Sequence, residues 1–314
     1  MSNIELNTTT ELAALLVISK NNSNILKWIV SRLFSLAWFK NNNMVQLSDG
    51  QHDNFLSLLY FCPYVSIETY DWSKITSTKI ISMLDNHYGI ILPINTKLLG
   101  ISEKPFYHNV FLYGSCDGKI NVYDFWAPTF KWGDKLFQPE SIVNAISKNS
   151  MLDRSAYSIK IKTELFDSKY TLLSLYRVIE NYLANNSKNN QSNAIYGIDV
   201  YDCICKYIME LKEIYYLDHT IFHNLGEHFE VIRLSLTLIE EYKHLYTYNI
   251  KKEIDELKQL SYFVKTLSMK YWRQQHIETT NWKANIINHV LQIKQKEINL
   301  LVQINHRIES ELKK

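Results

Sequence analysis

The sequence predicts an α+β fold with an antiparallel sheet for residues 44–165, followed by a mostly helical C-terminal region over 166–314. Three observations lead to this prediction. Helix-like segments come first and short apolar or alternating segments follow, which favours α+β over a parallel α/β order. Two alternating stretches flank a turn at Cys116–Gly118 and predict a β-hairpin over 107–126. From Asp167, apolar residues recur with helical spacing almost to the C-terminus.

Residues 1–43 form a predicted N-terminal helical extension. Residues 9–19 and 24–39 are typical of two short amphipathic helices, separated by the polar run Asn21–Asn24. The apolar runs in this part of the chain are far shorter than the ~20 residues that a membrane span requires. We expect these helices to serve packing or a partner surface rather than chemistry.

The remaining elements follow from periodicity and from helix-ending residues. In the α+β region, a helix at 53–61 ends before Pro63 and a second one at 73–87 ends at Gly89. The same criteria predict strands at 88–94 and 157–163, a helix at 138–147, and helices at 198–214, 218–247, 250–274 and 279–312. Helices of such lengths predict an antiparallel bundle or lid.

Charge and cysteine content restrict the function classes. A net charge of +2 over 314 residues gives no general electrostatic case for binding nucleic acid or an anionic membrane. The four cysteines form neither a disulfide framework nor a paired CxxC metal signature. Without a secretory leader in the sequence, we expect a reducing, cytoplasmic setting.

His108 and Asp124 are the candidate catalytic pair. A three-residue loop at Cys116–Gly118 would pair Ser115 with Lys119, and hence His108 with Trp126. Asp124 is then the diagonal neighbour of His108 on the same sheet face, roughly 7–8 Å away at Cα. A carboxylate at that position can fix the imidazole tautomer and support its charged form, as in the base-and-orienter half of a nucleophilic triad.

The position of a nucleophile is harder to assign. A thiol nucleophile works best at a helix N-terminus, where the dipole and free N–H groups stabilise a thiolate. The helix before the strands begins at Asp53 and Asn54, so an amide occupies the favoured position. Cys62 lies at the C-terminal end of that helix, and Cys116 lies in the hairpin turn, too far along the strand from His108.

Three histidines, His219, His223 and His228, lie close enough together in the sequence to raise the question of a metal site. His219 and His223 are four residues apart and could share one helix face, as metal-binding pairs do. No HExxH glutamate lies between them, and Gly226 interrupts the pattern before His228. We therefore expect Asp218 and His219 to cap a helix, and we expect neither a metal nor a cofactor.

The stretches Tyr107–Gly114 and Val122–Trp126 resemble a family found beside nonribosomal peptide and polyketide assembly lines. That family is similar to the N-terminal domain of butirosin biosynthesis protein H, and the closthioamide amide synthetase looks like a relative. The resemblance extends to Ile195–Asp202 and Asp218–His228 and covers roughly residues 45–312. It implies a papain-like, C39-like cysteine-protease-type fold. It also implies a cysteine after the aspartate at the helix start, the position that Asn54 holds here.

An amide side chain cannot form an acyl-enzyme, which leaves three accounts open. The nucleophile position is altered or engineered, or His108 acts directly as a general base, or the chain is a non-catalytic binding descendant. The resemblance implies an acyltransferase, or amide synthase, that moves an acyl group from a carrier-protein thioester to a small amine. The alternative is a catalytically silent protein that binds a carrier protein or an assembly-line partner. Neither reading requires nucleic acid or a membrane.

Overall fold

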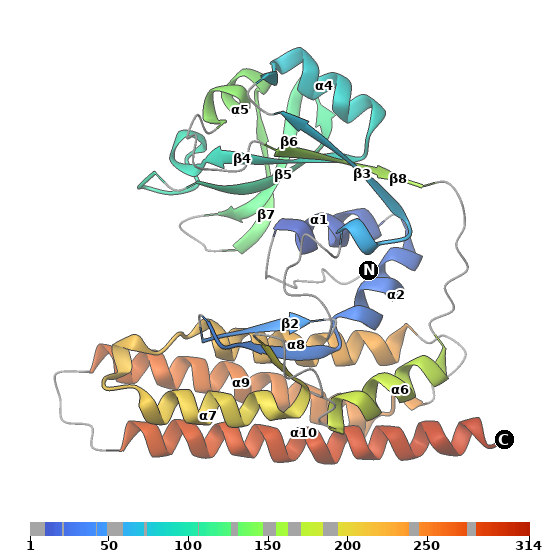
Figure 1. Ribbon diagram of the computed structural model, residues 1–314, viewed down its shortest axis with the longest axis vertical. Coiled ribbons are helices and arrows are strands. Elements are labelled where there is room, and N and C mark those ends of the chain that lie inside the picture. The colour runs from blue at the N-terminus through green and yellow to red at the C-terminus, as the bar shows by residue number, and fades with distance from the viewer. Residues whose placement is uncertain are drawn as a thin grey trace. The chain divides into compact units, whose positions relative to one another are not determined.

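A computed structural model of the chain comprises two compact units, which are described separately (Figure 1). The first unit contains residues 1–26 and 54–168, and the second contains residues 27–53 and 169–314. The structure describes residues 10–20, 22–41, 43–48, 59–71, 74–105, 107–126, 131–146, 155–162, 171–184, 194–238, 245–274 and 281–314.

The first unit contains a six-stranded antiparallel sheet in the order β3-β8-β4-β5-β6-β7. Its strands are β3 (Val65–Asp71), β4 (Gly89–Asn95), β5 (Tyr107–Cys116), β6 (Lys119–Trp126), β7 (Lys131–Phe137) and β8 (Ser155–Ile161). The helices of this unit are α1 (Thr10–Ser19), α4 (Ser77–Asn86) and α5 (Pro139–Ala145), with a 3₁₀ turn, η2 (Thr96–Leu99).

Strand β4 is apolar because both of its faces are covered. Six of its seven residues are buried, which matches the continuous apolar run expected of a strand inside a packed sheet. On one face, Ile90, Leu92 and Ile94 join a core with side chains of α4 and α5. That core also contains Val110 and Leu112 of β5, and Ile120 and Val122 of β6. The sheet segment that carries the candidate pair is therefore held by a dry core.

The second unit combines a small sheet with five helices. Its antiparallel sheet has the order β2-β1-β9, with β1 (Ser35–Phe39), β2 (Met44–Ser48) and β9 (Ala194–Tyr196). The helices are α6 (Leu172–Leu183), α7 (Val200–Glu210), α8 (Thr220–Thr237), α9 (Tyr248–Arg273) and α10 (Trp282–Leu312), with 3₁₀ turns η3 (Gly197–Asp199) and η4 (Ile214–Tyr216). Helix α2 (Ser23–Arg32) crosses the boundary between the two units.

Hydroxyl caps start two of these helices where the sequence changes from polar to periodic. The Thr171 hydroxyl accepts the backbone N–H of Ser174 at α6, and the Thr247 hydroxyl accepts that of Ile250 at α9. On α8, residues Ile221–Leu236 are buried almost without interruption, so this helix is enclosed by the rest of its unit. Helix α10 contacts α6, α7 and α9.

Two predictions for the N-terminal region and the C-terminal region are wrong in part. The predicted helix over 24–39 ends at Arg32, and Ser35–Phe39 is strand β1, which pairs with β2 and with β9. Strand β9 also interrupts the helical C-terminal region. Because β1 and β9 are more than 150 residues apart, local periodicity carries no signal of their pairing.

The division into units also differs from the predicted parts 1–43, 44–165 and 166–314. Helix α1 packs in the α+β unit, where the Thr10 hydroxyl donates to the Asn109 carbonyl at 2.7 Å. Residues 27–53 belong to the helical unit instead. The N-terminal segment is thus divided between the two units rather than forming a separate extension.

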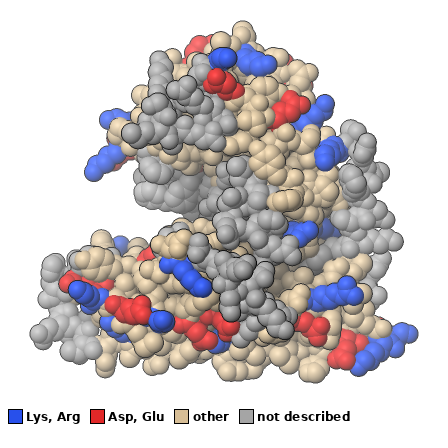
Figure 2. Space-filling view, in the orientation of Figure 1, with Lys and Arg blue, Asp and Glu red and all other residues tan. Residues whose placement is uncertain are grey.

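Charges of both signs alternate over the face shown in Figure 2, in agreement with the net charge of +2. Along the helical unit, many of them pair, as Lys294 does with Asp202 at 2.7 Å. Among the described residues, no helix combines the length and the apolar character that crossing a bilayer requires.

Candidate functional site

The β5–β6 hairpin closes with a tighter turn than the sequence predicts. Cys116 pairs directly with Lys119, so the turn contains two residues, Asp117 and Gly118, in place of the predicted three. Both have positive φ, +51° and +72°, as a type I′ turn requires. This turn alone would shift the whole hairpin by one residue.

A bulge restores the predicted register. Gly114 has a φ of +55° and lies at an irregularity between Tyr113 and Ser115, where one extra residue enters β5. Beyond it, Tyr113 pairs with Asn121 and Phe111 with Tyr123. These are the partners that the predicted Ser115–Lys119 pairing implies, because the shorter turn and the bulge cancel.

The register brings the candidate pair into contact. Nε2 of His108 lies 3.0 Å from Oδ2 of Asp124, which confirms the predicted contact between the two side chains. The Asp124 side chain is fully buried, whereas the His108 side chain is 28% exposed. The carboxylate is therefore shielded from water, whereas part of the imidazole reaches the surface.

Neighbouring strands hold both side chains in place. His108 lies at the start of β5 opposite Ile94 of β4, and the Thr10–Asn109 hydrogen bond fixes the next residue along β5. Asp124 lies opposite Gly133 of β7. A Cβ added at Gly133 would meet no described atom within 4 Å.

This arrangement can orient and relay a proton. An ionised Asp124 carboxylate accepts a hydrogen bond from Nε2–H of His108 and so selects the tautomer in which Nδ1 carries the lone pair. Proton transfer with a substrate then falls to Nδ1. A base held by a carboxylate is the part of a nucleophilic triad that activates an attacking group.

Asn54 lies outside the described residues, so its position relative to His108 stays a prediction. The end of its predicted helix is described: residues 59–61 are helical, and Cys62 follows directly. The Cys62 side chain is buried, and burial is the main reason that the pKa of its thiol rises to about 11. The predicted position of Cys62 at a helix C-terminus argues against a nucleophile, and its burial is a second and independent reason.

We expect Cys62 to react slowly with iodoacetamide. A thiol with a pKa near 11 holds about one thiolate in a thousand molecules at pH 8, and the thiolate is the reactive form. Cys116 is exposed in the hairpin turn and should be alkylated first. Mass spectrometry of tryptic peptides at increasing pH measures both rates, with urea-unfolded protein as the control in which all four thiols react. Rapid alkylation of Cys62 near neutral pH would make it the nucleophile candidate instead.

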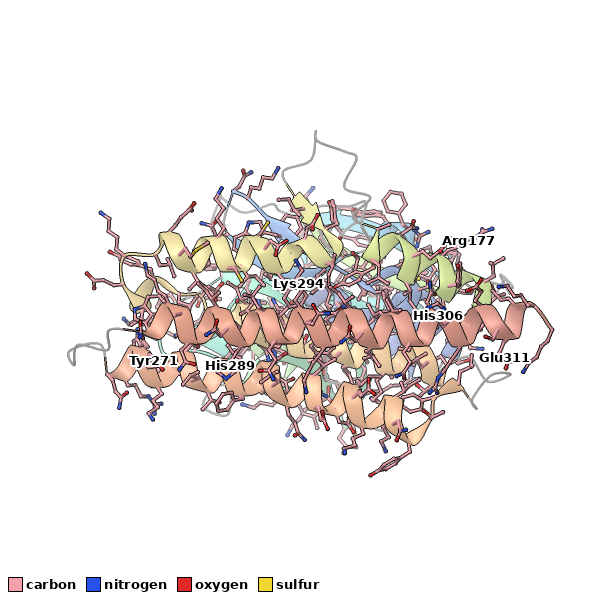
Figure 3. All side chains as sticks on the ribbon, turned by 90° about the horizontal axis from the view of Figure 1, so that it is seen from below. Arg177, Tyr271, His289, Lys294, His306 and Glu311 are labelled. Carbon is pink, nitrogen blue, oxygen red and sulfur yellow. The ribbon has the colours of Figure 1, made fainter. Side chains whose placement is uncertain are left out.

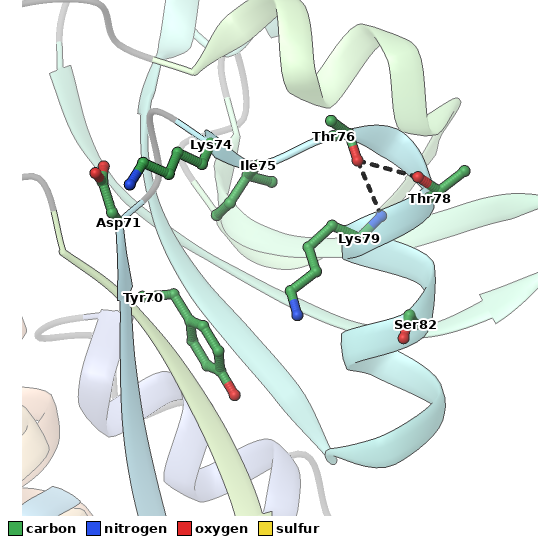
Figure 4. Close-up of a pocket in the computed structure, with 8 residues that line it drawn as sticks. All are labelled: Tyr70, Asp71, Lys74, Ile75, Thr76, Thr78, Lys79 and Ser82. Carbon is green, nitrogen blue, oxygen red and sulfur yellow. Dashed lines mark hydrogen bonds between the residues drawn. The ribbon is translucent and has the colours of Figure 1, made fainter.

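A cavity of about 620 Å³ lies at a different place in the α+β unit (Figure 4). It is bordered by edge strand β3 and by the start of α4, and Lys79 places its ammonium 5.4 Å from the centre of the Tyr70 ring. In the sheet order, β3 is three positions from β5. This cavity is therefore separate from the His108–Asp124 pair.

The three histidines considered as metal ligands, His219, His223 and His228, each contact a different side chain. His219 Nδ1 lies 2.8 Å from the Ser268 hydroxyl, His223 pairs with Glu227 at 3.2 Å, and His228 pairs with Glu297 at 2.7 Å. Among the described residues, no group of three or more metal-ligating side chains is assembled. Asp218 accepts the backbone N–H of Thr220 at 2.9 Å at the start of α8, whereas His219, the N-cap residue, makes no side-chain capping hydrogen bond, so the predicted capping role is confirmed only for Asp218.

The environment of His219 predicts a loss of stability in acid. Burial lowers the pKa of His219 below 6.5, and Lys265 adds to the effect while Asp218 opposes it. The folded state therefore binds a proton at His219 less readily than the unfolded chain does. The contribution of neutral His219 to the free energy of unfolding is fully present above pH 6.5 and is lost as the pH falls below that value. The urea midpoint should drop less between pH 7.5 and 5.5 in His219→Asn than in the original chain. The exposed His306→Asn serves as the control, and an identical pH dependence in both variants would contradict the assignment.

Sequence reasoning did not single out Glu297. The available signal was its place within the apolar stripe of α10, where a carboxylate is unexpected. Its hydrogen-bond partners, Tyr201 and His228, come from two other helices, so its role could not be read from α10 alone.

Comparisons with known proteins add no assignment. No protein-family model matches this chain, and a search of the curated proteins finds no match.

Proposed function

We propose that this protein is an amide-forming acyltransferase with a papain-like α+β domain, which transfers an acyl group from a carrier-protein thioester to an amine. The proposal is supported by one observation above all: a buried carboxylate holds a partly exposed imidazole at 3.0 Å on a rigid sheet. The family resemblance of the two hairpin strands supplies the substrate class.

The reaction requires little from the protein beyond proton transfer and orientation. His108 takes a proton from the incoming ammonium group, and the freed amine attacks the thioester carbonyl. The tetrahedral intermediate then breaks its C–S bond while its nitrogen gives a second proton to the leaving thiolate, which yields the amide and the carrier thiol. His108 releases the first proton to water. A thioester is already activated, so this route accommodates a chain with Asn54 at the position where the family has cysteine.

A second function follows from Asn54 itself. A chain without the nucleophile could retain the fold as a silent partner that binds a carrier protein. In that case the His108–Asp124 contact would serve only to stabilise the hairpin.

The test is to mix the full chain with an acyl-loaded carrier protein and a panel of primary amines. Mass spectrometry follows the carrier, the small-molecule product and the protein. Amide release that depends on the protein supports the transferase. Tight carrier binding without turnover supports the silent partner. If the chain neither binds the carrier nor turns over, both proposed functions are excluded.

A further inference from the structure

Two sequence segments that the proposed function does not use meet at one buried carboxylate in the helical unit. Tyr201 belongs to the segment Ile195–Asp202, and His228 ends the segment Asp218–His228. The Tyr201 hydroxyl donates to Oε2 of Glu297 at 2.5 Å, and Nε2 of His228 lies 2.7 Å from its Oε1. Helices α7 and α8 are thereby tied to α10.

A fourth helix contributes a ring to the same cluster. Tyr182 of α6 stacks on the His228 imidazole, with ring centres 5.2 Å apart, and Phe34 meets both rings edge-on. Burial, and then the charge of Glu297, raises the pKa of Tyr182 and Tyr201 well above 10. Both phenols therefore stay protonated. The Tyr201 hydroxyl donates to Glu297, whereas the buried Tyr182 hydroxyl has no hydrogen-bond partner among the described residues, and Tyr182 joins the cluster through its ring. We call Tyr182, Tyr201, His228 and Glu297 the Glu297 cluster.

The Glu297 cluster lies in the interior of the helical unit, where burying a polar group costs free energy. The side chains of Glu297 and His228 have no exposed surface. The His228 Nδ1 atom is also buried and has no hydrogen-bond partner among the described residues. Burying a carboxylate and an imidazole costs more than burying apolar side chains of similar volume, so the cluster is a poor means of gaining stability.

The Glu297 cluster bears on the register of α10, that is, on the position of this helix along its axis relative to its neighbours. Figure 3 shows α10 along its length, with His289, Lys294 and His306 labelled on it. Of the eight buried residues of α10, seven are apolar: Ile286, Val290, Ile293, Leu300, Leu301, Ile304 and Ile308. A slip by one helical turn, about 5.4 Å, would exchange apolar residues for one another at little cost. The same slip would carry the Glu297 carboxylate away from both donors and leave three polar groups buried without partners.

We propose that Glu297 is a polar lock that holds α7, α8 and α10 in one register, with α6 joined to it only through the Tyr182 ring that stacks on His228. The lock selects a single arrangement of the helical unit by penalising the alternatives, as single buried polar residues do in coiled coils. It is a conformational device separate from the His108–Asp124 chemistry.

Variants of the full chain distinguish selection of a single helix arrangement from a gain in the stability of the fold. Glu297→Leu leaves the Tyr201 hydroxyl and the His228 N–H buried without an acceptor, and should lower Tm by roughly 10 °C. The triple variant Glu297→Leu, His228→Leu, Tyr201→Phe should recover most of that loss. It should also show additional or broadened amide resonances for α10 and faster hydrogen exchange there. The half-buried Glu309→Leu on the same helix, whose carboxylate pairs with Lys313 at the surface, is the control and should change neither the Tm by a comparable amount nor the exchange of α10.

A nearly isosteric variant covers the case in which Glu297→Leu fails to fold. The Glu297→Gln carboxamide can accept from Tyr201 through its oxygen, but it then presents N–H to Nε2 of His228. The imidazole must move its proton to Nδ1, and the ¹⁵N shifts of the ring should report that tautomer change. A triple variant with one sharp set of resonances and unchanged exchange would overturn the lock, and so would a Glu297→Gln variant whose imidazole tautomer, Tm and α10 exchange all match those of the original chain.

Discussion

Replacing His108 with alanine should reduce amide formation by about 10²- to 10⁴-fold, the usual contribution of a positioned general base. His108 is the residue of the inferred site that can relay a proton near neutral pH, and Asp124 fixes its ring at 3.0 Å. Cys62→Ala and Cys116→Ala should leave turnover largely intact, because one thiol is buried and the other lies in the distant turn. The assay measures product released from a loaded carrier protein supplied with primary amines.

Asp124→Asn is the matched variant for this prediction. An amide keeps the volume of the carboxylate but cannot hold the same imidazole tautomer with the same strength, so turnover should fall toward that of His108→Ala. Circular dichroism and Tm of each variant control for unfolding. Full activity in His108→Ala would exclude direct general-base catalysis by this residue.

Replacing Asn54 with cysteine should produce the largest gain. If position 54 lies at a helix start beside His108, as predicted, a thiol there has the surroundings that favour a thiolate, and it should attack a thioester to form an acyl-enzyme. The expected observation is a mass increase equal to the acyl group after mixing with loaded carrier protein, followed by its loss when amine is added. Faster iodoacetamide labelling than of the native thiols at pH 6–7 is a second readout.

The double variant Asn54→Cys, His108→Ala provides the control, because the thiol should lose its activation without the imidazole. If the introduced thiol is no more reactive than Cys116, the start of the helix does not face His108, and the nucleophile position of the papain-like proposal is excluded. If neither the original chain nor Asn54→Cys turns over, yet both bind the carrier tightly, the silent-partner function is favoured.

The hairpin illustrates how far local sequence can position a site. Alternation and the turn residues predicted the two strands, and with them the proximity of His108 and Asp124. The turn itself was shorter than predicted, and the bulge at Gly114 compensated for it. The contact was thus predicted correctly although one detail of its derivation was wrong, because the burial of alternate residues fixes register more strongly than the turn does.

Strands β1, β2 and β9 illustrate the opposite case. The apolar stretch Leu33–Phe39 fits a buried helix as well as a buried strand, since short apolar runs have no distinguishing period. Its strand form depends on pairing with Met44–Ser48 and with Ala194–Tyr196. The second of these partners is remote in the sequence, so the outcome is decided by tertiary contacts.

The sequence by itself determined the long C-terminal helices, the β4–β5–β6 segment and the pairing of His108 with Asp124, because each depends on periodicity or on neighbours within about 20 residues. Only the tertiary structure decided which side chains are desolvated. Burial makes the Cys62 thiol a weak acid, and it brings Glu297 against Tyr201 and His228, which lie 96 and 69 residues away along the chain. The physical reason is that hydrophobic periodicity specifies which face of an element is covered, whereas the identity of the covering group is a property of the packed fold.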